Sequence, residues 1–212
     1  MQQTENAAAV AEKKSLAPRD VVVIGAASGG AAALANIIPK LPSSFSASVI
    51  VVQEMRPGFT RLLASDLSTA SAMTVEEAEH RQSLRRNIVL IAPGMRGVTL
   101  ARGPLAEFPF MTVLEDLTES VAKTRSRIDI AMKSAVEMFG PRTVGVLLTG
   151  AGTDGLEGMK AIRACGGKTI AQDQESSLLY DMPRAAIDAG VVDEVLPLWS
   201  IADRLAQFIG DE

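Results

Sequence analysis

The chain has 212 residues and a formal net charge of −4, with 47% hydrophobic, 22% charged and 4% aromatic residues. This length suffices for one domain with a sizeable core. The acidic charge and low aromatic content exclude a nucleic-acid-binding protein with a basic or stacking surface. No apolar run approaches the roughly 18 residues of a membrane-spanning helix, so we expect no membrane insertion. The single cysteine, Cys165, excludes an internal disulfide and a cysteine-based zinc site.

The first residues differ in composition from the rest of the chain. Residues 1–18 are polar and rich in alanine, and we expect a disordered tail or a linker there. They lack the continuous apolar segment of a secretory signal, so we expect a cytoplasmic protein. Residues 19–212 are expected to form one α/β domain.

After the tail, short apolar segments alternate with helix-forming segments. We expect strands at residues 21–24, 48–53, 87–92, 143–148, 168–171 and 191–195. We expect helices at residues 31–40, 58–70, 127–139, 156–165 and 199–209, and a short one at Pro183, whose missing N–H is harmless at a first helical position. Fully apolar strands that alternate with helices are typical of a doubly wound, mostly parallel sheet with helices on both faces.

One segment departs from this alternation. Two short runs between residues 97 and 114 are separated by Gly103 and Pro104. They predict an antiparallel hairpin laid across one edge of the sheet.

Three glycine-containing loops follow expected strands, at residues 25–30 (GAASGG), 54–60 (EMRPGFT) and 149–155 (TGAGTDG). Active sites of parallel sheets lie beyond the carboxyl ends of the strands, so the loops predict one common site. The first loop, with Glu54 at the end of the second strand, could bind a dinucleotide, although its spacing is not G-x-G-x-x-G. It could equally hold a nucleophile beside amides that bind an oxyanion. The loop alone leaves both interpretations open.

The strings VGVLLTGAGTDGLEGM (residues 144–159) and KTIAQDQESSLLYDMPRAAI (residues 168–187) resemble the catalytic domain of the CheB-family chemotaxis receptor methylesterases. VIGAASGG, VVQEMRPGFT, IAPG, and Arg125 followed by Ile128-Asp129 are similar too, so the resemblance covers residues 19–209. It implies a doubly wound sheet that hydrolyses glutamyl methyl esters on chemoreceptors with a Ser-His-Asp triad. We expect neither a cofactor nor a metal. Family members usually carry an N-terminal receiver domain, and we expect no receiver domain in residues 1–18.

Two of the three triad positions that the resemblance implies hold other residues. The nucleophile position is Ala27, the base position is Glu54, and the acid survives as Asp154, while Ala151 corresponds to part of the oxyanion pocket. A triad that lacks a member leaves only about 10³–10⁴-fold acceleration over water. We therefore expect impaired hydrolysis and a retained role in binding a methyl-accepting chemotaxis receptor or another protein of the chemotaxis pathway.

Several side chains could compensate for the missing groups. Ser28 is a weak candidate for a substitute nucleophile, and its alternative role is to cap the following helix. Glu54 and Asp154 would face each other and could share a proton or hold a hard cation. The alternative is that Asp154 caps the helix that starts at Gly155 and that Glu54 is a solvated loop residue.

The remaining candidates rest on the resemblance alone. Gly29, Arg125, Met182 and Arg184 correspond to positions of the oxyanion pocket or the receptor-facing cleft, and a surface charge or a core methionine is the alternative for the last three. His80, the only histidine, is expected to be a solvated surface residue. Two other functions stay open: an active methylesterase or glutaminyl deamidase with a non-standard site, and a dinucleotide-binding module.

Overall fold

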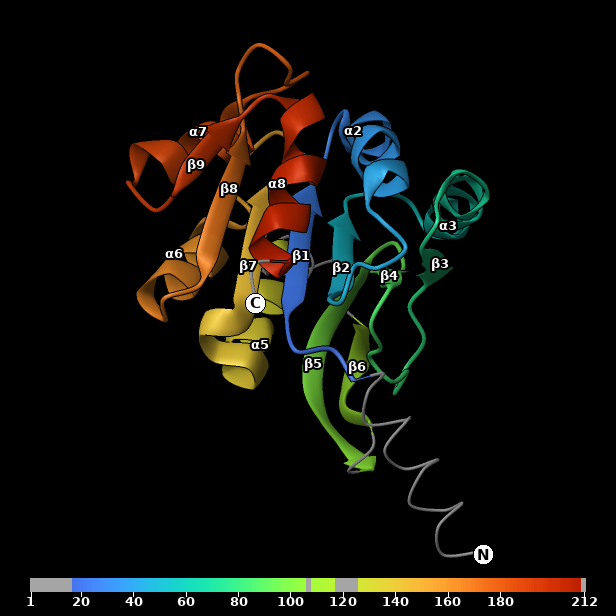
Figure 1. Cartoon of the computed structure of the whole chain (residues 1–212). Coiled ribbons are helices and arrows are strands. Elements are labelled where there is room, and N and C mark those ends of the chain that lie inside the picture. Colours follow the sequence, from blue (N-terminus) through green and yellow to red (C-terminus); the bar gives the residue numbers. More distant parts are fainter. Residues whose placement is uncertain (1–16, 106–107, 117–125, 211–212) are drawn as a thin grey trace, which may run out of the picture.

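The computed structural model describes residues 17–105, 108–116 and 126–210, so most of the expected tail and Arg125 lie outside the described residues. Its centre is a seven-stranded sheet in the order β3-β4-β2-β1-β7-β8-β9, in which every pairing is parallel (Figure 1). The strands are β1 (Val21–Ala26), β2 (Ser48–Gln53), β3 (Thr74–Glu77), β4 (Ile88–Ile91), β7 (Thr143–Leu147), β8 (Lys168–Gln172) and β9 (Glu194–Leu196).

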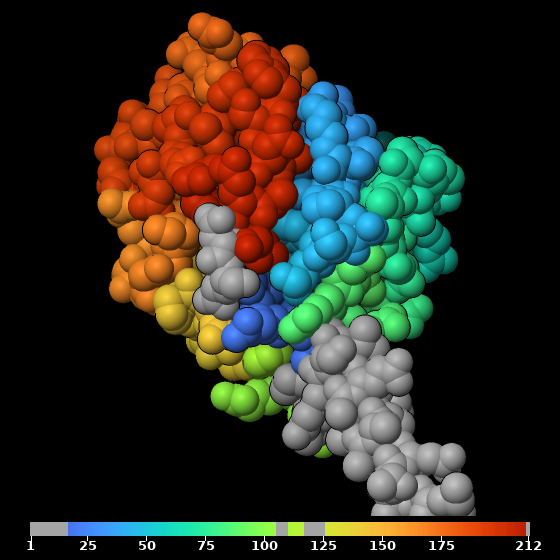
Figure 2. All heavy atoms as spheres, viewed as in Figure 1, coloured from blue at the N-terminus to red at the C-terminus, as the bar shows by residue number. Residues whose placement is uncertain are grey.

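Helices cover both faces of the sheet because the central strands are apolar on both sides. Val22 and Ile24 of β1 pack in one core with α2 (Gly30–Ile37), α3 (Phe59–Ala70) and α8 (Leu198–Gly210). Val21 and Val23 pack in a second core with α5 (Arg127–Phe139), α6 (Leu156–Ala164) and α7 (Asp181–Asp188). This period-two division is the one that a strand requires. In Figure 2, α8 lies directly against α2 on the first of these faces. The expected doubly wound α/β class is confirmed.

The expected hairpin is present as β5 (Arg96–Leu105) and β6 (Phe108–Asp116). The two strands form a separate antiparallel sheet and do not extend the large one. Val98 and Leu100 join the second core, and the backbone N–H of Leu100 donates to Oγ of Ser134 on α5 at 3.0 Å. The hairpin therefore packs against α5, on the face of the sheet that this helix covers.

β3 does not follow from the sequence pattern, and α7 begins earlier than the sequence predicts. β3 reads TVEE, a short and largely polar segment, and it forms the edge of the sheet next to β4. α7 begins at Asp181, so Pro183 is its third residue and not its first. The missing N–H of Pro183 is still harmless, because N–H groups of the first helical turn have no acceptor within the helix.

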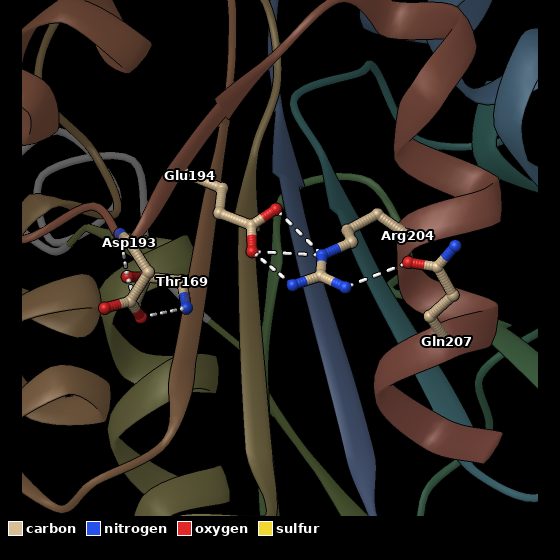
Figure 3. A network of polar contacts seen from close by, with 5 residues as sticks. All are labelled: Thr169, Asp193, Glu194, Arg204 and Gln207. Carbon is tan, nitrogen blue, oxygen red and sulfur yellow. Dashed lines mark hydrogen bonds and ion pairs between the residues drawn. The ribbon is translucent and has the colours of Figure 1, made fainter. Parts of the chain in front are cut away.

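The opposite edge, β9, is fixed by two polar contacts (Figure 3). Asp193 Oδ2 accepts hydrogen bonds from the backbone N–H and the hydroxyl of Thr169, both at 2.9 Å. Arg204 of α8 donates to both carboxylate oxygens of Glu194 and lies 4.2 Å from the centre of the Phe208 ring. These contacts join the last strand to its neighbour and to the last helix. No helix in the described part of the chain has the length and apolarity to cross a membrane.

Candidate active site

The loops after β1, β2 and β7 meet at the carboxyl end of the sheet, as the sequence predicts. β1 lies between β2 and β7, so its loop is flanked by the other two. The backbone N–H of Glu54 donates to the carbonyl of Ala26 at 2.9 Å, and the N–H of Ala27 donates to the carbonyl of Thr149 at 3.0 Å. These bonds continue the parallel hydrogen-bonding pattern beyond the strands and bring the triad-equivalent segments together.

The side chain at the nucleophile position is buried and packed. Ala27 is 4% exposed and belongs to the second core. A Cβ added to Gly150 would lie 2.8 Å from the Cβ of Ala27 and would also overlap the sulfur of Met182. The structure thus places Met182, which is 1% exposed, in the core beneath the loops.

The expected cap on α2 is wrong. The N-cap residue is Gly29, with φ of 85°, and no side chain caps the helix. Ser28 is exposed, and its carbonyl accepts a hydrogen bond from the hydroxyl of Thr149 at 3.0 Å. A Cβ on Gly29 would lie 2.8 Å from the Cβ of Leu178, so the glycine permits both the left-handed turn and the close approach of the segment after β8.

A buried side chain that the sequence analysis did not single out connects the first two loops. Gln53, the last residue of β2, is 4% exposed. Its Nε2 donates to the carbonyl of Ala27 at 2.8 Å and to the carbonyl of Glu54 at 2.9 Å. The amide therefore joins the backbones of the nucleophile position and the base position.

Two further buried residues connect the third loop to the segment after β8. Gln172, the last residue of β8, accepts the N–H of Thr149 at 2.9 Å and donates to the carbonyl of Ser176 at 2.7 Å. The hydroxyl of Thr149 accepts the N–H of Leu179 at 2.9 Å. A polar residue that ends an otherwise apolar strand, as in SVIVVQ and KTIAQ, is the sequence signal that could have revealed Gln53 and Gln172.

Asp154, at the expected position of the triad acid, caps a helix, but not the helix that the sequence suggested. Asp154 Oδ1 accepts the backbone N–H groups of Ile128 at 3.1 Å and Asp129 at 3.2 Å, in the first turn of α5. Asp129, which is 7% exposed, accepts the N–H of Gly158 in the first turn of α6 at 2.7 Å. The alternative role of Asp154 as the cap of the helix that follows Gly155 is therefore wrong, and Asp129 fills that role.

Burial raises the pKa of Asp154, and the nearby Asp129 carboxylate adds to this effect. The N–H groups of Ile128 and Asp129 and the charge of Arg127 act in the opposite direction and lower the pKa. Glu54 is exposed, and its carboxylate has no hydrogen-bond partner among the described residues. Within the described part of the chain, Glu54 and Asp154 thus form no hydrogen-bonded pair.

The other candidates lie at the surface. Ala151 is exposed in the turn after β7. Arg184 forms an ion pair with Asp181 at 3.0 Å, and its side chain is 59% exposed. His80 is exposed as expected, and its Nδ1 accepts the backbone N–H of Leu114 at 3.2 Å. Arg125 lies outside the described residues.

Comparisons with known proteins agree with the geometry. Residues 22–205 match the family model described as CheB methylesterase. The protein-glutamate methylesterase/protein-glutamine glutaminase 1 of Carboxydothermus hydrogenoformans is 44% identical over 188 residues, which cover 89% of this chain and 55% of that protein. The corresponding protein of Symbiobacterium thermophilum is 41% identical over 195 residues, which cover 92% of this chain and 52% of that protein.

The chain thus spans about half the length of the curated relatives it matches. Among solved structures, the catalytic domain of the Thermotoga maritima CheB methylesterase superimposes with a TM-score of 0.82 at 36% identity. That match covers 89% of this chain and 97% of the solved chain. The similarity therefore extends over the whole catalytic domain.

Proposed function

This chain belongs to the CheB methylesterase family, and we propose that it binds a methyl-accepting chemotaxis receptor without hydrolysing the receptor's glutamyl methyl esters. The observation that carries the proposal is the pair of side chains at the two loops that Gln53 joins. Ala27 presents a buried methyl group where the family's nucleophile would stand, and Glu54 presents an exposed carboxylate where the family's histidine would stand. A methyl group cannot attack the ester to form an acyl-enzyme intermediate, and a carboxylate cannot take and return a proton at neutral pH as imidazole does.

The geometry argues against a substitute nucleophile. Ser28 is exposed, and its hydroxyl forms no hydrogen bond with any described residue, whereas an activated nucleophile needs a base within hydrogen-bond reach. The one histidine, His80, accepts the N–H of Leu114 on the hairpin, and in the described residues it makes no hydrogen bond to the loops after β1, β2 or β7. The dinucleotide alternative is also disfavoured, because Leu178 fills the space over Gly29 that a pyrophosphate would need.

Exposed apolar side chains support a retained binding role. Phe59 is 55% exposed and Leu62 is 60% exposed, both on the first turns of α3 after the loop of Glu54. Leu178 is 72% exposed and packs over Gly29 of the first loop. Apolar side chains exposed on both sides of a candidate site are typical of a surface that contacts another protein.

A titration of the receptor's cytoplasmic fragment tests the binding role. We expect Phe59→Ser and Leu178→Ser each to weaken binding about tenfold, since such side chains become buried at protein interfaces. Val195→Ser is the matched control, because Val195 is 45% exposed but lies on the edge strand β9. Equal affinities for all three variants, or no binding by the unaltered chain, would contradict the proposal.

Back-substitution tests the loss of hydrolysis. The double variant Ala27→Ser, Glu54→His should release methanol from methylated receptor, because the turn backbones, the Gln53 contacts and Asp154 are in place. The same variant with Asp154→Asn is its control, and we expect it to lose most of the gain. A double variant that folds but stays at background would show that the scaffold no longer supports the reaction.

A further inference from the structure

We infer that Gln53 is a positioning residue, whose buried amide holds the loops of Ala27 and Glu54 in one fixed relation. This inference rests on the proposed function, because the exposed side chains of the proposed binding surface, Phe59 and Leu178, lie beside these loops. It concerns how the two loops keep their relative position although Ala27 and Glu54 replace the expected catalytic side chains.

The contacts of Gln53 lie where the backbone pairing of the two strands ends. The last backbone bond between the first two loops is the one from Glu54 N–H to the carbonyl of Ala26. Beyond it, one N–H of the Gln53 amide donates across the gap to the carbonyl of Ala27, and the other donates to the carbonyl of Glu54, the next residue in its own loop. The Ala27 carbonyl also accepts the N–H of Gly30, at 2.9 Å, at the start of α2. One side chain therefore fixes the first loop, the second loop and the beginning of a helix.

The space around the amide confines it to this position. Gln53 is 4% exposed, and its Oε1 is buried with no hydrogen-bond partner among the described residues. A Cβ on Gly30 would overlap this oxygen, so the glycine leaves the room that the amide occupies. A buried polar group that leaves one acceptor unsatisfied costs stability, and its donors must offset that cost. The two bonds from Nε2 to the carbonyls of Ala27 and Glu54 offset this cost only while both loops stay in place.

Gln172 offers a matched comparison on the other side of the site. It is also a buried glutamine at the end of a strand, but it joins Thr149 to Ser176 by accepting the N–H of Thr149 with its oxygen and donating to the carbonyl of Ser176. None of its bonds reaches the loops of Ala27 or Glu54. The two glutamines thus hold different pairs of segments, and the bonds of Thr149 to Ala27 and Ser28 connect the first loop to the third.

Amide hydrogen exchange on the full chain tests the assignment. In Gln53→Met, which keeps the volume and removes the donors, we expect the N–H groups of Gly30 and Glu54 to exchange about tenfold faster. The N–H groups of Thr149 and Leu179 should be unaffected. Gln172→Met should give the reverse pattern. Equal acceleration at all four positions, or none in Gln53→Met, would overturn the inference.

A second variant covers the case in which Gln53→Met does not fold. Gly30→Ala keeps the glutamine but displaces its amide and also crowds the Cβ of Ala26, and it should accelerate exchange at Glu54 in the same way. Unchanged exchange at Glu54 in Gly30→Ala would equally overturn the inference. The two proposals are tested by different measurements. A chain that does not bind receptor contradicts the proposed function. The exchange pattern decides the role of Gln53 whether or not receptor binds.

Discussion

Asp154 and Asp129 cap each other's helices. Asp154 caps α5, which contains Asp129, and Asp129 caps α6, which begins just after Asp154. Asp154 precedes α6 but accepts the N–H groups of the first turn of α5, and Asp129, within that turn, accepts the N–H of Gly158 in α6. The N-cap residues of the two helices, Ser126 and Gly155, make no side-chain cap bond of their own. Asp154, the residue at the expected triad-acid position, therefore has a structural use that requires no histidine beside it.

This use predicts that Asp154 contributes to stability. Asp154→Ala removes the acceptor of two backbone N–H groups, and we expect the free energy of unfolding to fall by about 1–2 kcal/mol. Urea unfolding followed by circular dichroism measures it. Glu54→Ala is the control and should change stability by less than about 0.5 kcal/mol, as is usual for an exposed residue without partners. A loss no larger for Asp154→Ala than for Glu54→Ala would show that the cap is unimportant.

The raised pKa of Asp154 predicts how the stability of the chain depends on pH. For an acid whose pKa is higher in the folded state, the stabilisation is complete below the unfolded-state value, 3.8 for Asp154, and is lost as pH rises through the folded-state pKa. Asp154→Asn cannot titrate and serves as the reference. We expect the stability of the unaltered chain relative to Asp154→Asn to decrease as the pH rises above about 4. An increase over that range would mean that the two N–H bonds outweigh burial.

Two ion pairs, one that joins β9 to α8 and one within α7, differ in exposure and geometry. Arg204 donates to both oxygens of Glu194 and stacks on Phe208, and the two charged side chains are 33% and 28% exposed. Arg204→Met should cost about 1–2 kcal/mol of unfolding free energy. Arg184→Met breaks a single bond between side chains that are 59% and 50% exposed, and should cost at most about 0.5 kcal/mol. Equal losses in thermal unfolding would contradict this ranking.

Ser28 provides a test of the remaining catalytic alternative. Because its hydroxyl has no base within the described contacts, Ser28→Ala should leave methanol release at background in the unaltered chain. The same change in the Ala27→Ser, Glu54→His variant should leave the recovered activity within about twofold. Release above background by the unaltered chain that Ser28→Ala abolishes would identify Ser28 as a nucleophile.

The fold followed from the sequence wherever strands are buried on both faces. β1, β2, β4 and β7 are entirely buried and are apolar along most of their length, so their pattern predicted them and the loops at their ends. β3 could not be found in this way, because its TVEE segment is partly exposed at the sheet edge and owes its conformation to pairing with β4.

The site was predictable in its loops but not in its contacts. The position of Gly29 in the left-handed region moves the start of α2 past Ser28, and local sequence does not reveal that conformation. The exchange of caps between Asp129 and Asp154 depends on how α5 and α6 pack together, across 25 residues of sequence. Tertiary packing alone determines it.

Methanol release by the unaltered chain tests the central claim most directly. Fully methylated receptor is mixed with an excess of the chain, so that even one slow turnover is detected, and the Ala27→Ser, Glu54→His variant serves as the positive comparison. We predict that the unaltered chain releases no more methanol than receptor alone, while the variant releases measurably more. Release above background by the unaltered chain, abolished by unfolding it, would contradict the claim that Ala27 and Glu54 have ended ester hydrolysis.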